Sequence, residues 1–273
     1  MPLTPFGRIR RALQRVRPLP FPLPEYPRSA PRVGGEAGAL LLPTPRTIEA
    51  AALSPEAHAA VLDVLSKLTQ NPELEAEQAR YRAAEAQFGP YWRHADLLKV
   101  LWAVTTLVRP MSYLEIGVRR GKSCAVIGSV APECSIFGFD MWMEDYFGQP
   151  NPGPEFVEGE LKAAGHRGNV TFVTGKSQEA VPEFLRQHPD LYFDLITIDG
   201  DKSLQGCGSD FANALPRLKV GGVVVCDDLP LNPDLRLVWQ RMIQQDGRYV
   251  GWMFAGAGGV VVAVRIADSP GWR

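Results

Sequence analysis

Apolar and polar residues follow two different periods along the chain, and the change falls near residue 110. Before it, apolar residues recur at helical spacing behind typical helix starts, a cap residue followed by proline at Ser54 and at Asn71. A third helical pattern over residues 91–108 stops at Pro110. We therefore expect a helical cap over residues 46–110.

After residue 110, short apolar runs alternate with helical segments, which is the pattern of a parallel doubly wound sheet. A short glycine-rich connection joins the last two strands and implies an antiparallel hairpin at the sheet edge. The sequence predicts a Rossmann-like α/β fold, a seven-stranded and mostly parallel sheet over residues 111–273. The expected strands are 111–116, 135–139, 169–174, 193–198, 220–226, 249–255 and 259–265, and the expected helices are 122–130, 155–164, 178–188, 203–216 and 232–245.

Residues 1–45 form a separate Pro/Arg-rich N-terminal arm. They contain ten of the 24 prolines, so most of the arm can be neither helix nor central strand. Residues 1–35 also hold seven arginines against one acidic residue. Apolar residues from Phe6 to Val16 recur at helical spacing, which would allow a short basic amphipathic segment on an acidic surface or on membrane headgroups. A poorly ordered arm, or one that follows the surface of the domain, is the alternative that we favour.

The composition is that of an ordinary globular protein, with 273 residues, 45% hydrophobic and 22% charged. A net charge of -1 gives no case for nucleic acid as a partner. No stretch approaches the roughly 18 continuous apolar residues of a membrane span. Four cysteines without a C-x-x-C pair fit reduced thiols and a cytoplasmic protein. Whether the chain forms a homo-oligomer is left open.

The first strand leads into a glycine-bracketed turn, Glu115-Ile116-Gly117-Val118-Arg119-Arg120-Gly121-Lys122-Ser123. In an open α/β sheet a ligand lies at this turn, against the N-terminus of the next helix. A dinucleotide-binding G-x-G-x-x-G would need glycines where Arg119 and Lys122 stand. A phosphate-binding G-x-x-x-x-G-K-[ST] would need its first glycine at Ile116, so the loop is one residue too short.

The acidic-apolar-Gly-x-x-x-Gly run of this turn resembles that of the class I S-adenosylmethionine-dependent methyltransferases. Glycine there lets the backbone approach the cofactor closely. An ordinary strand-to-helix turn without a ligand is the alternative. The resemblance implies S-adenosylmethionine as the cofactor, bound through Glu115, Gly117, Arg119, Gly121 and Ser123.

Two further strand ends carry residues suited to an adenosine ligand. Asp140 ends the second strand, where a carboxylate can accept hydrogen bonds from both ribose hydroxyls. After the third strand, Gly175-Lys176-Ser177-Gln178 resembles the Gly-x-Ser-Gln segment of catechol O-methyltransferases, which implies that Ser177 and Gln178 contact the adenine. Ser177 can also serve as a helix cap.

Three acidic residues follow two neighbouring strands. Asp199 ends the fourth strand, and Asp227 and Asp228 end the fifth. Carboxylates that converge without histidine or cysteine form a hard oxygen site, suited to Mg²⁺ or another divalent cation. Without a cation they would repel one another and raise each other's pKa.

Together these motifs resemble the metal-dependent catechol-type O-methyltransferases and their relatives that act on macrolide sugar hydroxyls. The resemblance implies that Asp199, Asp227 and Asp228 hold the metal, that Asp199 also contacts the cofactor, and that Lys202 is the catalytic base. It implies O-methylation of a small-molecule acceptor, a natural-product sugar or a phenol. For this role Lys202 must be neutral, and we expect the cation to lower its pKa.

The long aromatic loop over residues 141–153 is expected to line the acceptor pocket, because such loops are usually functional; packing against the cap is the alternative. Other functions stay open. A P-loop-like nucleotide hydrolase or kinase would use Gly121-Lys122-Ser123, a non-catalytic adenosine-binding protein would keep the fold alone, and a metal-independent methyltransferase would share fold and cofactor.

Overall fold

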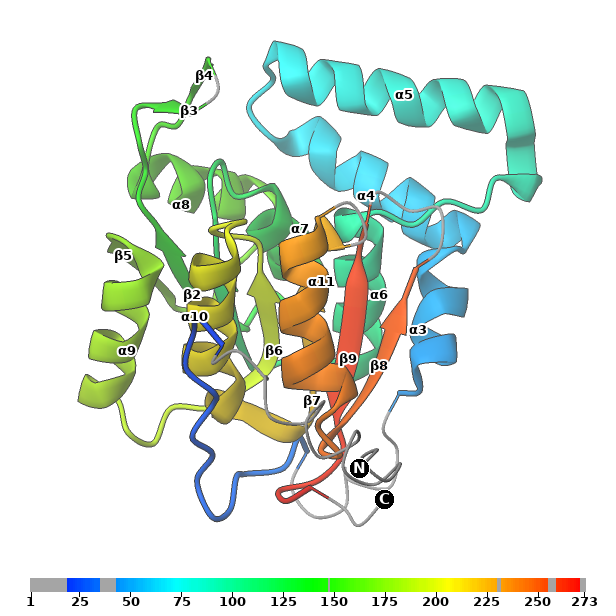
Figure 1. The fold of residues 1–273 in the computed structure, drawn as a ribbon. Helices are drawn as coiled ribbons and strands as arrows, with labels where there is room; N and C mark the ends of the chain where they lie inside the picture. Colours follow the sequence, from blue (N-terminus) through cyan, green and yellow to red (C-terminus); the bar gives the residue numbers. More distant parts are fainter. Residues whose placement is uncertain (1–18, 35–42, 147, 230–231, 255–258, 271–273) are drawn as a thin grey trace, which may run out of the picture.

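A seven-stranded sheet lies between two layers of helices in the computed structural model (Figure 1), which describes residues 19–34, 43–146, 148–229, 232–254 and 259–270. Its strand order is β5-β2-β1-β6-β7-β9-β8, with β9 antiparallel to both neighbours and the pairs from β5 to β7 parallel. The predicted fold class is therefore confirmed. The strands are β1 (Ser112–Ile116), β2 (Ser135–Asp140), β5 (Val170–Thr174), β6 (Phe193–Ile198), β7 (Leu218–Cys226), β8 (Tyr249–Met253) and β9 (Val261–Arg265).

Each face of the sheet has its own apolar core, which explains why the central strands β1 and β6 are buried at every position. On β1, Tyr113 belongs to the core under one helical layer, whereas its neighbour Leu114 belongs to the core under the other. The first layer contains α3 (Pro45–Ala52), α6 (Leu97–Val108), α7 (Lys122–Val130) and α8 (Pro154–Ala163), and the second contains α9 (Ser177–Gln187), α10 (Leu204–Ala214) and α11 (Pro233–Trp239). A π-helical segment, Gln240–Gln244, continues α11.

The helices before the sheet begin where their caps are. Ser54 caps α4 (Pro55–Lys67) and Asn71 caps α5 (Pro72–Phe88), as the sequence predicts. The third predicted helix begins at Leu97, not near residue 91, because the Asp96 side chain caps it and the chain before it is extended. The helix α3 was not expected, although its cap and proline repeat the same start signal. The helices α3 and α6, which precede residue 110, pack in one layer with α7, which follows it. The domain boundary at residue 110 stays a prediction.

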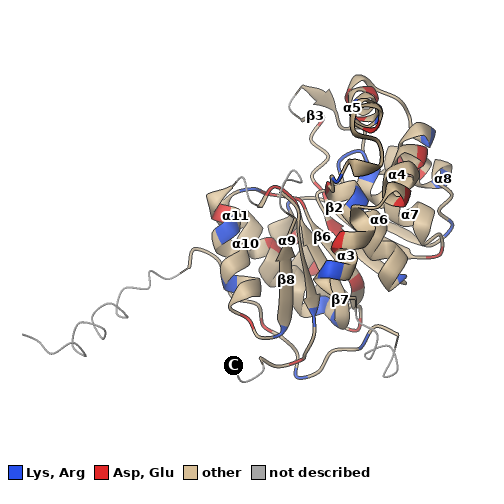
Figure 2. Cartoon of the chain, turned by 90° about the vertical axis from the view of Figure 1, so that its right-hand side faces the viewer, with Lys and Arg blue, Asp and Glu red and all other residues tan. Residues whose placement is uncertain are grey.

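Helix α5 lies across the carboxyl ends of the strands (Figure 1). It is a polar helix that buries three side chains, Leu74, Gln78 and Tyr81, and its acidic residues stand out in Figure 2. Two polar anchors hold it, one just before its first residue and one near its middle. Before it, the Thr69 amide and hydroxyl donate to Glu160 of α8; within it, the Tyr81 hydroxyl donates to Asp96.

The described part of the N-terminal arm, residues 19–34, follows the surface of the domain. Phe21 is 5% exposed and packs on Gly208 of α10, where a Cβ would lie 2.2 Å from its ring. The Tyr26 hydroxyl lies 2.8 Å from that of Tyr249, and residues 31–33 exchange backbone hydrogen bonds with Val220. The amphipathic segment expected from Phe6 to Val16 lies outside the described residues.

All four cysteines are buried free thiols. Among the described residues, no helix is both long enough and apolar enough to cross a membrane.

Candidate active site

A cavity of about 820 Å³ opens where the carboxyl ends of the parallel strands meet the N-terminal helices. Its floor is formed by residues that follow β1, β2, β5, β6 and β7, and α5 forms part of its wall. Ligands of open α/β sheets bind at this edge. Of the predicted site residues, it is lined by Gly117, Arg119, Ser123, Asp140, Ser177, Gln178, Asp199, Lys202, Asp227 and Asp228.

The two glycines of the turn are required by close contacts. Gly117 has a φ of +93°, and a Cβ there would lie 2.4 Å from the backbone oxygen of Asp199. Gly121 has a φ of +77°, and its Cβ would lie 2.5 Å from Val157 of α8. Gly117 therefore lets β1 and β6 end side by side at the cavity. Gly121, which the sequence placed at the cofactor, instead accommodates α8 and does not line the cavity.

Glu115 was predicted to contact the cofactor, but the structure places its side chain away from the cavity. Glu115 is fully buried and does not line the cavity. Its carboxylate accepts hydrogen bonds from the Ser123 hydroxyl and, at 2.7 Å, from the Cys124 thiol. Burial raises the pKa of Glu115 to about 7 despite these donors. The residue thus joins the end of β1 to the start of α7 behind the turn.

Asp140 binds the backbone of the glycine turn and remains accessible from the cavity. One carboxylate oxygen accepts from the Arg119 amide at 2.7 Å and the other from the Trp142 amide at 2.6 Å. Each oxygen has a second lone pair, so the carboxylate can also accept from ribose hydroxyls.

Ser177 and Gln178 begin α9 at the cavity edge. Lys176, and not Ser177, is the cap residue of this helix, and it makes no side-chain cap hydrogen bond. The Gln178 amide donates to Asp201 at 3.3 Å. Both residues lie on the same side of the cavity edge as Asp140, because β5 pairs with β2.

The three predicted metal ligands do converge. Asp199, Asp227 and Asp228 offer carboxylate oxygens within 4.8 Å of one another. Burial and the charges of its two neighbours raise the pKa of Asp227 to about 7. Asp228 holds a left-handed backbone with a φ of +61°, an unfavourable conformation that turns its side chain at the strand end. An all-oxygen donor set of this kind fits a hard divalent cation.

Lys202 lies beside these three acids. Their negative charges favour its ammonium form, whereas the predicted role as a base requires the neutral amine. Its ammonium donates to Asp199 and lies 3.3 Å from Asp228. Burial favours the neutral amine, but attraction to Asp199 outweighs burial, so the pKa of Lys202 is raised above its ordinary range. With these residues alone, Lys202 is a cation that neutralises the acids.

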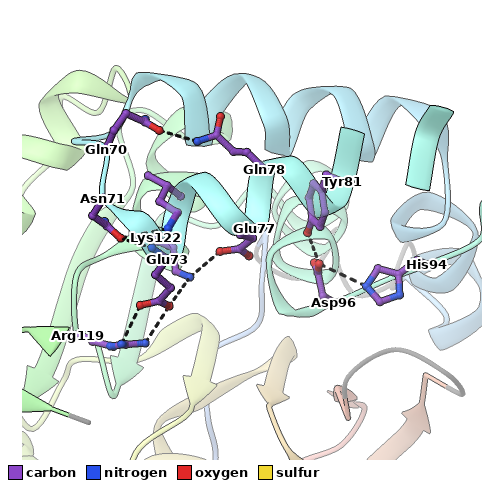
Figure 3. Close-up of polar contacts among 11 residues, drawn as sticks. Gln70, Asn71, Glu73, Glu77, Gln78, Tyr81, His94, Asp96, Arg119 and Lys122 are labelled. Atoms are coloured by element: carbon purple, nitrogen blue, oxygen red, sulfur yellow. Dashed lines mark hydrogen bonds and ion pairs between the residues drawn. The ribbon is translucent and has the colours of Figure 1, made fainter. Parts of the chain in front are cut away.

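Two acidic residues of α5 reach the glycine turn, and sequence reasoning missed them. Glu73 accepts from the two terminal guanidinium nitrogens of Arg119, Nη1 and Nη2, at 3.1 and 2.9 Å. The Lys122 ammonium lies 3.3 Å from Glu73 and 2.7 Å from Glu77 (Figure 3). The lysine of the P-loop-like motif is thus paired with α5. No local signal in the sequence joins residues some 45 positions apart.

A second group missed by sequence reasoning lines the cavity beside α6. The His94 ring lies parallel to that of Trp92. The His94 Nε2 is 3.6 Å from Asp96 (Figure 3). Asp96 also accepts from the buried Tyr81 hydroxyl. These residues lie in the segment that the sequence assigned to a helix.

The loop over residues 141–153 lines the cavity in part, as predicted. Met141, Met143 and Tyr146 face it, whereas the Trp142 indole donates to the Arg119 carbonyl at 3.1 Å and packs on Phe172. A small hairpin of β3 (Asp145–Tyr146) and β4 (Gln149–Pro150) closes the loop. Phe147, expected to add apolar surface, lies outside the described residues.

Comparison with known proteins agrees with this arrangement. Residues 114–229 match the model of a family described as a methyltransferase domain. No curated protein sequence matches the chain.

Solved methyltransferase structures share the fold. The calicheamicin methyltransferase CalS11 is 20% identical, with a TM-score of 0.51 over 78% of this chain and 93% of its own. The O-methyltransferase TomG of Streptomyces achromogenes, in complex with S-adenosylmethionine, is 18% identical, with a TM-score of 0.52 over 73% and 92%. An O-methyltransferase from Bacillus cereus is 17% identical, with a TM-score of 0.50 over 69% and 89%. With the family match over the glycine turn and the acidic strand ends, these likenesses give residues 114–229 the fold of a methyltransferase domain.

Proposed function

We propose that this protein is a class I S-adenosylmethionine-dependent methyltransferase that transfers the methyl group to a hydroxyl of a small molecule, a natural-product sugar or a phenol, with the help of Mg²⁺ or another divalent cation. The observation that supports it is the convergence of Asp199, Asp227 and Asp228 within 4.8 Å, at the same cavity as the glycine turn. Transfer to nitrogen or carbon does not need three carboxylates that hold a cation. A hydroxyl acceptor does gain from them, because a bound cation makes the hydroxyl more acidic.

The cofactor would lie along the strand ends in a definite order. Ser177 and Gln178 would contact the adenine, and Asp140 would accept from the ribose hydroxyls. The sulfonium would then lie over Gly117, on the side of Asp199, because β1 lies between β2 and β6. This order would bring the methyl group close to Asp199, Asp227 and Asp228.

The chain's own residues would align the acceptor and move its proton. A divalent cation held by the three acids would stabilise the deprotonated oxygen of the acceptor as a Lewis acid. Lys202 Nζ can take the acceptor's proton only as a free amine, so it would first have to leave Asp199 and release its own proton to solvent. The apolar part of the lining, which includes Met141, Met143 and Leu97, would limit water around the sulfonium.

The test is transfer of radiolabelled methyl from S-adenosylmethionine to a panel of sugar nucleotides and phenols, with Mg²⁺ or with EDTA. We expect transfer that EDTA abolishes, and D227N and D228N variants with at least about 100-fold lower turnover, as is typical when an electrostatic contribution to the transition state is removed. D234N, on α11 outside the cavity lining, is the matched control. Transfer that survives EDTA and D227N would refute the metal, and transfer to nitrogen or carbon alone would refute the hydroxyl acceptor.

The position of Lys202 favours a second candidate, a metal-independent O-methyltransferase. Its ammonium already neutralises Asp199 and Asp228, the role otherwise given to the cation. In that enzyme EDTA has no effect and K202M abolishes transfer at every Mg²⁺ concentration. In the metal-assisted enzyme K202M lowers turnover, leaves cofactor affinity nearly unchanged, and transfer still depends on Mg²⁺.

A further inference from the structure

Four charged side chains from two distant segments meet over the glycine turn. Glu73 and Glu77 project from α5, and Arg119 and Lys122 come from the turn and the start of α7 (Figure 3). All four line the cavity, and their side chains are between 15% and 32% exposed. Two acids and two bases thus form a neutral cluster whose groups remain accessible to a ligand. We call it the α5 charge cluster.

The attachment of α5 to the domain does not depend on this cluster alone. The segment before α5 is anchored by Thr69 on Glu160, and the middle of the helix by Tyr81 on Asp96. The side chains of Leu74 and Tyr81 are buried beneath it. Partly exposed ion pairs contribute little net stability. The cluster can therefore exchange partners while α5 stays in place.

The cluster lies at a definite end of the cofactor path. Asp140, the ribose acid, accepts a hydrogen bond from the Arg119 amide at 2.7 Å. The guanidinium of the same arginine binds Glu73, and Glu73 and Glu77 share Lys122. The adenine side of the cavity, at Gln178, lies beyond Asp140 in the other direction, because β5 is at the outer side of β2. A ligand with its ribose at Asp140 therefore extends its other end toward the cluster.

That end of S-adenosylmethionine is an α-amino acid, which carries one ammonium and one carboxylate. We propose that the α5 charge cluster is the subsite for this zwitterion. The cofactor carboxylate accepts hydrogen bonds from Lys122 Nζ, and the cofactor ammonium donates to Glu73, with Glu77 and Arg119 completing the balance of charge. Each new ion pair replaces one within the cluster, so no charge is left without a partner. The proposal rests on the proposed cofactor, and it needs neither the metal nor the acceptor.

Binding of two ligands by calorimetry tests the subsite. S-adenosylhomocysteine carries the amino-acid end, whereas 5′-methylthioadenosine has the same adenosine and sulfur without it. We expect K122M to weaken S-adenosylhomocysteine roughly 10- to 100-fold, as for loss of a charged hydrogen bond, and to leave 5′-methylthioadenosine within about twofold. Retained binding of 5′-methylthioadenosine also shows that the variant is folded. The control is E75Q, an exposed α5 residue that does not line the cavity.

A double variant, E73Q with E77Q, separates two-sided recognition from competition. If the acids bind the ammonium, S-adenosylhomocysteine weakens about tenfold or more and 5′-methylthioadenosine does not. If the acids merely compete with the cofactor carboxylate for Lys122, S-adenosylhomocysteine binds more tightly, which overturns the proposal. The proposal is also overturned if K122M binds each of the two ligands as tightly as the wild type does. Because no transfer is measured, these results are independent of whether the enzyme methylates a hydroxyl.

Discussion

Replacing Gly117 with alanine gives a measurable estimate of how closely the glycine turn approaches β6. Any alanine at a φ of +93° costs about 1–2 kcal/mol in backbone strain. The added Cβ would also lie 2.4 Å from the Asp199 oxygen and 2.9 Å from the Gly200 nitrogen. These atoms are backbone at a buried strand end, so they can yield only if β6 shifts, and such overpacking costs about 1–3 kcal/mol more. We expect G117A to lower the free energy of unfolding by about 2–5 kcal/mol.

The matched control is G165A. Gly165 has nearly the same φ, +94°, with no atom within 4 Å of an added Cβ, so it isolates the backbone strain. Urea unfolding of wild type and both variants measures the difference. S-adenosylhomocysteine affinity should fall for G117A alone, because a shift of Asp199 displaces the floor of the cavity. If the two variants are equally destabilised, the contact with β6 does not constrain the turn and this reasoning is wrong.

Three other predictions concern stability. Glu115 has a folded pKa of about 7 against an ordinary value of 4.5, so the free energy of unfolding should fall by about 3 kcal/mol as pH rises through this window; E115Q should lose this part of the slope in urea titrations from pH 4 to 8. F21A should cost about 3 kcal/mol in the same assay, against about 0.5 for L23A at 60% exposure; equal effects would show that the arm is not packed. Y81F removes the hydroxyl that donates to the Asp96 carboxylate and should lower the free energy of unfolding by about 1–3 kcal/mol, measured by calorimetry. An unchanged melting temperature would contradict this prediction.

Local patterns were sufficient to predict most of the fold. The apolar runs of β1 and β6 are buried on both faces, so their composition differs sharply from that of the helices between them. Errors arose where two signals overlapped. Thr44-Pro45 is a good helix start, but the prolines of the arm obscured it. Asp96 caps α6, yet the aromatic residues before it resemble a continuing helix.

The site was predictable where it follows strand ends, because topology alone brings Asp199 together with Asp227 and Asp228. It was not predictable where burial decides the role of a residue. Glu115 belongs to the motif, but its carboxylate faces Ser123 and Cys124 instead of the cavity. The acids of α5 look like an ordinary solvated helix face in the sequence, and their partners become evident only when α5 lies over the turn.

The four buried thiols of this protein can report where its structure opens. They are distributed over both helical layers and the sheet: Cys124 on α7, Cys134 before β2, Cys207 on α10 and Cys226 at the end of β7. An alkylating reagent can reach each sulfur only when that part of the molecule opens. Mass spectrometry of the rate at each cysteine would therefore map which layer loosens first, and whether a bound cofactor slows it, without a single engineered label.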